Sequence, residues 1–221
     1  MTRSVAMVHT VASLVASFDE LARELVPDIV VYHIVDESLL TITREAGRIT
    51  PQTRRRLLGH LASAQEIGVA AALVTCSSVG PAVEASRQFL DITLVRVDEA
   101  MAEAAIRMGR RVGVVATLRS TLEPTRELIE RTAAAAGKGT EVVARICEGA
   151  FEAASHGDTN KHDALVAEGI LALSREVDVL VLAQASMARA LPRLADRSMA
   201  TPVLSSPRSA VERLRDVLAA S

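Results

Sequence analysis

The chain has 221 residues, a formal net charge of −2 at pH 7 and 49% hydrophobic residues, few of them aromatic. This length fits one large domain or two small ones with a proper core. The near-neutral charge argues against a nucleic-acid partner, which needs a concentrated basic surface. No apolar run approaches the roughly 18 residues that a membrane span needs. The one basic run, Arg54–Arg56, is expected to form a solvated helix face.

The N-terminal segment resembles a weak signal peptide, but His9 and Ser13 interrupt its apolar run, so we expect a strand followed by a loop. The two cysteines, Cys76 and Cys147, are far apart and provide no disulfide framework. A reducing cytosol is the usual setting for such thiols. We therefore expect a soluble, cytoplasmic protein without membrane contact.

Predicted strands and helices alternate along the whole chain, which indicates βαβ units, a parallel sheet and right-handed crossovers. Thr50 and Pro51 are a typical helix start, as N-cap and first helical residue. The predicted strands are Ser4–Val8, Ile29–Val35, Ala70–Thr75, Thr93–Val97, Arg111–Ala116, Glu141–Ile146, Val177–Ala183 and Pro202–Leu204. The predicted helices are Leu14–Leu25, Pro51–Ile67, Pro81–Phe89, Glu99–Met108, Glu123–Ala136, Lys161–Arg175, Ala188–Ala195 and Ser209–Ala219.

The sequence repeats itself at an offset of 107 or 108 residues: Arg111–Thr117 aligns with Ser4–Thr10, and Val177–Ser186 with Val69–Ser78. Such self-similarity indicates a duplication. It predicts an α/β fold of two pseudo-symmetric Rossmann-like lobes with parallel sheets. The N-terminal lobe would comprise residues 1–98 and 207–221, and the C-terminal lobe residues 99–206.

The duplication places polar residues at equivalent strand ends. Thr10 and Thr117 end one equivalent pair of strands, and residues 75–78 and 183–186 follow another pair. Ligands of open parallel sheets bind beyond the carboxyl ends of the strands. We therefore expect these loops to meet around a small ligand in the cleft between the lobes.

Cys76 follows an apolar strand and precedes Ser77, Ser78 and a helix start at Gly80. Free N–H groups at such a start favour an anion, so we predict a lowered pKa for this thiol. A thiolate there would act as a base or nucleophile, while nearby hydroxyl and N–H groups hold a carboxylate or an enolate. A small buried packing cysteine is the alternative.

Cys147 also follows a strand, and by the same geometry we place it on the rim of the cleft, with a half-buried structural thiol as the alternative. His9 stands beside Thr10 at a strand end, whereas His60 and His162 are expected on helix surfaces. The histidines show no metal-ligand spacing, so no metal site is expected. Neither GxGxxG nor GxxxxGK[ST] occurs, which argues against dinucleotide and phosphoryl-transfer chemistry.

Over nearly its whole length the chain resembles the aspartate/glutamate/hydantoin racemase superfamily. The motifs that carry the resemblance are Val-Thr-Cys76-Ser-Ser, Gly113-Val-Val-Ala-Thr117, Val-Leu-Ala-Gln184-Ala-Ser-Met and Thr201-Pro-Val-Leu-Ser-Ser-Pro207. The resemblance implies a cofactor-independent enzyme in which two cysteines remove and return a proton on opposite sides of Cα. It also implies that hydroxyl and N–H groups hold the substrate carboxylate, and it is compatible with a homodimer or a higher homo-oligomer.

By position, Cys76 matches the first catalytic cysteine of that family, and Gln184 stands where the second is expected. Gln has no proton-transfer chemistry near neutral pH. His9 stands where amino-acid racemases often carry an acidic residue, which suggests a substrate other than glutamate or aspartate. The expected substrate-binding residues are Thr10, Thr75, Ser77, Ser78, Thr117, Gln184 and Ser186.

Three hypotheses remain. The first is a racemase-like isomerase acting on Cα of a small carboxylate (an amino acid, hydantoin, hydroxy acid or dicarboxylic acid) through Cys76, with His9 or Cys147 as the second acid. The second is a one-thiol lyase similar to arylmalonate decarboxylase, although that relative keeps its thiol in the second half. The third is a non-catalytic protein that binds small carboxylates.

Overall fold

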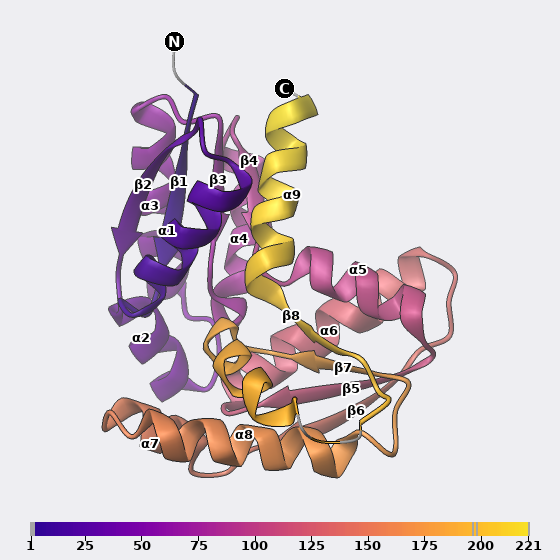
Figure 1. Ribbon diagram of the computed structural model, residues 1–221. Helices are drawn as coiled ribbons and strands as arrows, with labels where there is room; N and C mark the ends of the chain where they lie inside the picture. Colours follow the sequence, from indigo (N-terminus) through magenta and orange to yellow (C-terminus); the bar gives the residue numbers. More distant parts are fainter. Residues whose placement is uncertain (1–2, 196, 198, 221) are drawn as a thin grey trace. The chain divides into compact units, whose positions relative to one another are not determined.

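The computed structural model describes residues 3–195, 197 and 199–220. The chain divides into two compact units. The first unit contains the chain through Glu99 and again from Pro207 on, and the second contains Ala100–Ser206. Figure 1 shows the helices and strands of both units with their labels.

The first unit is built on a four-stranded parallel sheet in the order β2-β1-β3-β4. Its strands are β1 (Ser4–His9), β2 (Val30–Val35), β3 (Ala71–Val74) and β4 (Thr93–Arg96). Its helices are α1 (Leu14–Leu25), α2 (Ser38–Ala46), α3 (Pro51–Glu66), α4 (Gly80–Ser86) and α9 (Ser206–Ala220). Two short 3₁₀ turns, η1 (Ser77–Val79) and η2 (Arg87–Phe89), flank α4.

The second unit repeats this plan with a parallel sheet in the order β6-β5-β7-β8. Its strands are β5 (Arg111–Ala116), β6 (Glu141–Ile146), β7 (Val179–Leu182) and β8 (Val203–Ser205). Its helices are α5 (Glu99–Met108), α6 (Arg119–Ala135), α7 (Ala150–Ser155) and α8 (Thr159–Leu173), with the 3₁₀ segment η3 (Ala185–Leu194).

The two sheets share one topology and nearly one register. In each unit the first strand lies between the second and the third, and all neighbours are parallel. Val8 pairs with Val74 in the first unit, and Val115 pairs with Leu182 in the second. The α/β class with two parallel sheets is thereby confirmed.

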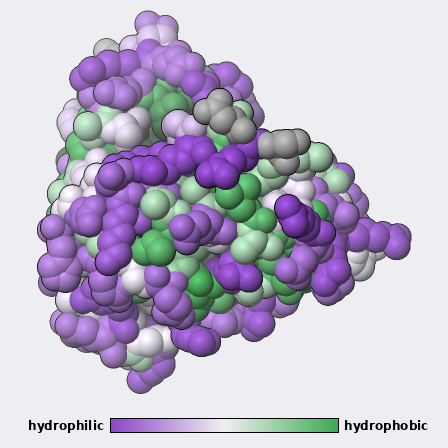
Figure 2. All heavy atoms as spheres, turned by 60° about the horizontal axis from the view of Figure 1, so that its bottom comes forward, coloured by the Kyte–Doolittle hydropathy of each residue, from purple (hydrophilic) through white to green (hydrophobic). Residues whose placement is uncertain are grey.

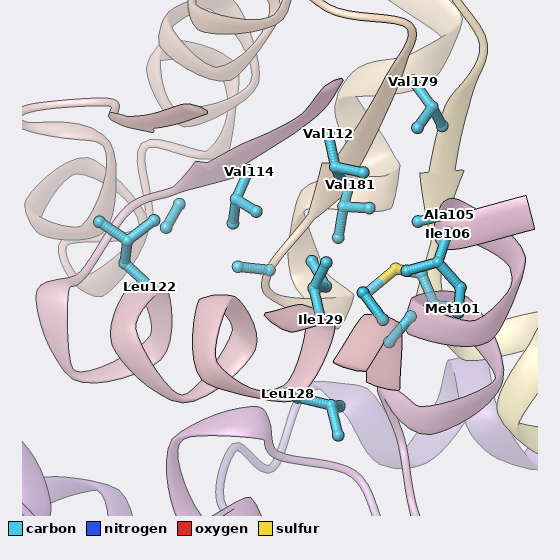
Figure 3. Packing of buried hydrophobic residues seen from close by; sticks show 14 residues of the cluster. Met101, Ala105, Ile106, Val112, Val114, Leu122, Leu128, Ile129, Val179 and Val181 are labelled. Carbon is cyan, nitrogen blue, oxygen red and sulfur yellow. The ribbon is translucent and has the colours of Figure 1, made fainter. Parts of the chain in front are cut away.

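Helices cover both faces of the second sheet, as its continuous apolar strands require. On the face shown in Figure 3, Val112, Val114, Val179 and Val181 of the sheet pack against a cluster that includes Ile129 of α6. On the opposite face, the cluster of buried residues comprises Val115, Leu180 and Leu182 of the sheet with Val166, Ile170 and Leu173 of α8, among others.

In the first unit, Ala6, Val8, Ala72 and Val74 of the sheet pack in one cluster that includes Leu57 of α3. On the surface face drawn in Figure 2, hydrophilic side chains separate small groups of apolar ones. Among the residues that the structure describes, no helix combines the length and the apolar character that a membrane crossing requires.

The largest differences from the sequence prediction are two missing helices and the start of a third. The prediction omitted α2 and α7, and it began the helix before Gly137 at Glu123, whereas α6 begins at Arg119. Pro124 favoured the later start, because proline is usual in a first turn. In the structure Pro124 lies inside α6, whose first turns also bury Leu122 and Thr125.

Candidate functional site

Thr10 and Cys76 lie opposite each other at the carboxyl end of the first sheet. Thr10 comes two residues after Val8 of β1, and Cys76 comes two residues after Val74 of β3. Val8 and Val74 are paired in the sheet. The Thr75 N–H donates to the Val8 carbonyl oxygen over 3.0 Å, which extends the ladder to the start of the loop. This register brings two of the predicted site residues together from segments 66 positions apart.

The Cys76 sulfur, on a partly exposed residue, has four hydrogen-bond partners. They are the hydroxyls of Thr10 and Ser78 and the backbone N–H groups of Ser78 and Val79. Burial raises the pKa of Cys76 above its ordinary value, although these hydrogen bonds favour the thiolate. The prediction of a lowered pKa is therefore wrong, because desolvation outweighs the loop's donors.

Ser77 adds a polar group without a partner to this loop. Ser77 is buried, and within the described part of the chain its Oγ makes no hydrogen bond. A buried hydroxyl that lacks a partner is uncommon in native structures and is often explained by an absent ligand or water. The loop therefore offers a thiol and an unused hydroxyl on adjacent residues.

Both ring nitrogens of the buried His9 are engaged by neighbouring side chains. Nδ1 lies 3.0 Å from Thr75 Oγ1, and Nε2 lies 2.9 Å from His33 Nδ1. Since the Thr75 hydroxyl donates to the Val8 carbonyl oxygen, it accepts from Nδ1–H of His9, and Nε2 then accepts from His33. Burial, followed by the charge of His33, lowers the pKa of His9 to about 4.

This network changes what His9 and Thr75 can do. His9 is neutral at physiological pH, and it would have to give up a hydrogen bond to act as an acid. The Thr75 hydroxyl, predicted to bind substrate, is committed to Val8 and His9. His33, which no sequence pattern singled out, completes the network, and its Nε2 lies 3.7 Å from Asp19 Oδ1.

In the second unit, Thr117 and Gln184 occupy the positions equivalent to Thr10 and Cys76. Val115 pairs with Leu182, so the two residues again stand opposite each other just beyond the strands. The Thr117 N–H donates to Gln184 Oε1 over 2.9 Å, and Gln184 Nε2 donates to Thr117 Oγ1 over 2.5 Å. Ser186 follows in η3 and is partly exposed.

Cys147 is not on a rim. The residue is 6% exposed and belongs to the core cluster between the second sheet and α8. A Cβ atom at Gly169 of α8 would overlap the Cys147 sulfur, so the thiol fills the space that this glycine leaves. Burial raises the pKa of Cys147 to about 11. The expected rim position is wrong, because the side chain points into the sheet–helix interface.

A buried ion-pair cluster lies under the Cys76 loop. The Arg96 guanidinium, 1% exposed, donates to both carboxylate oxygens of Asp98 over 3.0 and 2.9 Å and also pairs with Glu84. A Cβ atom at Gly80 would come within 2.6 Å of three guanidinium atoms. Gly80 therefore allows the start of α4 to lie directly on Arg96.

Not all of the residues expected on helix surfaces lie there. Arg54, Arg55 and Arg56 are exposed, as expected, and Arg56 and the half-buried His60 both contact Asp36 of the loop after β2. His162 was expected on a surface, but it is buried and lies 2.7 Å from Asp163. Among the described residues, no group of three His, Cys, Asp or Glu side chains is arranged to hold a metal ion.

The family model for Asp/Glu/hydantoin racemases matches residues 5–214 of the chain. The chain belongs to this family. The resemblance found in the Cys76, Thr117 and Gln184 motifs is thus confirmed over nearly the whole sequence. No curated protein matches the chain.

The fold of this chain is similar to those of solved racemase structures over nearly its whole length. An allantoin racemase from Klebsiella pneumoniae has a TM-score of 0.72 at 17% identity, covering 99% of this chain and 88% of that one. A glutamate racemase from Bacillus anthracis has a TM-score of 0.71 at 18% identity, with 99% and 82% covered. An aspartate racemase homologue from Pyrococcus horikoshii has a TM-score of 0.70 at 14% identity, with both chains covered in full.

Proposed function

We propose that this racemase-family protein is a cofactor-independent enzyme of the isomerase class that transfers a proton at Cα of a small carboxylate. Cys76 is the acid and base. The observation that carries the proposal is the Cys76 loop, where the thiol of a partly exposed residue, surrounded by hydrogen-bond donors, adjoins a Ser77 hydroxyl that has no hydrogen bond among the described residues. We select Ser77 as a carboxylate ligand for that reason.

The raised pKa of Cys76 favours the protonated thiol as the resting form of the enzyme. A sulfur that holds its proton at neutral pH can donate it to an enolate-like carbanion. In the reverse step the thiolate accepts a proton from Cα, and Thr10 with the N–H groups of Ser78 and Val79 stabilises that thiolate.

The second thiol of a two-thiol racemase has no equivalent among the candidate residues. Cys147 lies in the core, Gln184 is a neutral amide, and both nitrogens of His9 are engaged. Water therefore remains as the second proton carrier in our proposal. The same observations favour one alternative, a decarboxylase, because protonation of a carbanion after loss of carbon dioxide needs a single acid.

Incubation of candidate acids in deuterium oxide tests the proposal. We expect deuterium at Cα of an amino acid, hydantoin or hydroxy acid, read by NMR and mass spectrometry, with at least a ~100-fold loss of rate in Cys76→Ala. Carbon dioxide release would support the decarboxylase instead. Binding without either reaction, seen as a rise in melting temperature, would support a carboxylate-binding protein.

Cys147→Ala is the matched control, because it removes the other thiol from the core cluster of the second unit. We expect its exchange rate to stay within a few-fold of the wild type once the folded fraction is taken into account. Unchanged exchange in Cys76→Ala would overturn the proposal.

The cellular setting and the assembly are part of the same proposal. Both cysteines are free thiols, which supports a reducing cytoplasm. A homodimer or higher homo-oligomer rests on the family resemblance, and light scattering on the purified protein would determine the mass of the assembly.

A further inference from the structure

Strand β2 forms one outer edge of the first sheet, as Figure 1 shows. The N–H groups of Val30 and Asp36 donate to carbonyl oxygens of β1 and of the residue before it. Because successive strand residues direct their main-chain groups to opposite sides, those of Val31, His33 and Val35 point away from β1. The structure gives these outward groups no hydrogen-bond partner among the described residues. β2 therefore presents an open row of main-chain donors and acceptors.

The side chains of β2 are apolar and unusually exposed. Val30, Tyr32 and Val35 are 42%, 46% and 44% exposed, and they are three of the six large hydrophobic residues that are exposed in the described part of the chain. Tyr32 is also the only tyrosine of the sequence. Exposed apolar side chains that gather on a strand with open main-chain groups favour an interaction surface over isolated surface residues.

The other outer strands of the two sheets are protected in ways that β2 is not. β4 and β8 are short, with four and three residues. β6 has the length of β2, but it carries Glu141 and Arg145 as exposed charged residues. Short length and charged side chains are usual means of preventing sheet edges from pairing. From Ile29 to Val35 the chain contains no Asp, Glu, Lys or Arg, so β2 lacks this protection.

We infer that the outer edge of β2 is a contact surface for a second copy of this chain, which joins two first-unit sheets through antiparallel β2 strands. An identical strand suits this edge, because the edge has no charge to select an oppositely charged partner and a two-fold axis makes one patch complementary to itself. An axis through His33 places odd-numbered residues opposite odd-numbered ones, so opposed side chains share a face, as antiparallel pairing requires. His33 then exchanges hydrogen bonds with His33 of the second copy, Val31 does so with Val35, and Tyr32 packs beside Ile34.

Hydrogen exchange tests this contact in the wild type. Light scattering first identifies one protein concentration at which the dimer dominates and one at which the monomer does. The outward amides of Val31, His33 and Val35 should exchange at least ~tenfold more slowly in the dimer, because pairing protects them. The inward amides of Val30 and Asp36, which are bonded in each copy, are the internal control and should be protected at both concentrations.

Two variants test the same contact by mutation. Val31→Pro removes an N–H that points away from β1, which an outer strand tolerates, and its loss on both sides of the axis should raise the dimer dissociation constant at least ~tenfold. Tyr32→Lys adds a charge of the kind that protects sheet edges and should act in the same direction. Phe89→Lys is the matched control, because Phe89 is an exposed apolar residue outside β2, and it should leave the dissociation constant unchanged.

The inference rests on the homodimer proposed above and not on the proposed proton transfer, which Cα exchange tests separately. A wild type that stays monomeric would overturn both the homodimer and its contact. A dimer whose outward β2 amides exchange as freely as those of the monomer, or whose dissociation constant is equal in the wild type and both variants, would overturn the contact alone. Were Val31→Pro to unfold, Tyr32→Lys and hydrogen exchange of the wild type decide the matter.

Discussion

At the scale of single residues, four polar side chains at the end of the first sheet differ in their hydrogen bonds and protonation. Cys76 holds a proton under neutral conditions, because burial raises its pKa against the pull of its hydrogen-bond donors. Thr75 and His9 form a bonded pair that orients the strand end. Ser77 is the one of these hydroxyls left without a partner among the described residues.

His9 gives a testable pH dependence at this scale. Its pKa in the folded chain is about 4, below the unfolded value near 6.5, so the unfolded chain binds the proton first. Stability is therefore complete above pH 6.5 and falls as the pH drops toward 4. Between pH 7 and pH 5 we expect the wild type to lose about 2 kcal/mol more than His9→Gln in urea unfolding. Parallel losses in the two proteins would show that His9 carries no such shift.

At the scale of elements, the segment η1–α4 packs on the buried ion pairs of Arg96. Arg96 is held by Asp98 and Glu84, and its guanidinium lies against the backbone of Gly80. The N–H groups that reach the Cys76 sulfur belong to the turn just before Gly80. Displacing this contact would therefore move the donors of the thiol.

Gly80→Ala tests that contact. The new methyl overlaps a guanidinium that is fixed by two carboxylates, so we expect a loss of about 1–3 kcal/mol in unfolding free energy. Gly59→Ala is the matched control, because Gly59 lies inside α3 and a Cβ atom added there would meet no atom within 4 Å. That substitution should instead gain about 0.5–1 kcal/mol from helix propensity. Equal stabilities of Gly80→Ala and Gly59→Ala would show that the Arg96 side chain moves aside at little cost in free energy.

Sequence patterns located many elements but not the direction of their side chains. The bounds of Leu14–Leu25, Glu99–Met108, Arg111–Ala116 and Glu141–Ile146 match the structure. Arg96 was hidden inside a predicted apolar strand, because its carboxylate partners come from separate turns and helices. Cys147 was placed at the right strand end with the wrong orientation, since a strand-end residue points to either face depending on tertiary packing.

At the scale of the whole molecule, one βαβ plan is used twice with different residues at one equivalent position. The repeat predicted the equivalence of Thr10 with Thr117 and of Cys76 with Gln184. Within its own unit, each register places Thr10 opposite Cys76 and Thr117 opposite Gln184. The hydrogen bonds of Gln184 could not be predicted, because they depend on side-chain conformation. Divergence of the two halves leaves a thiol at only one of the two equivalent positions, Cys76 and Gln184.

The ratio of Cα deuterium exchange to inversion, measured on one pure enantiomer of a turned-over acid, tests this one-thiol arrangement most directly. With Cys76 as the only protein acid and base, deuterium should enter several-fold faster than the opposite enantiomer forms, so early product keeps its starting configuration. Exchange and inversion at equal rates from the first turnover would mean that the opposite face of the carbanion is protonated as efficiently as the face that Cys76 serves, which a single thiol does not explain, and would contradict the account.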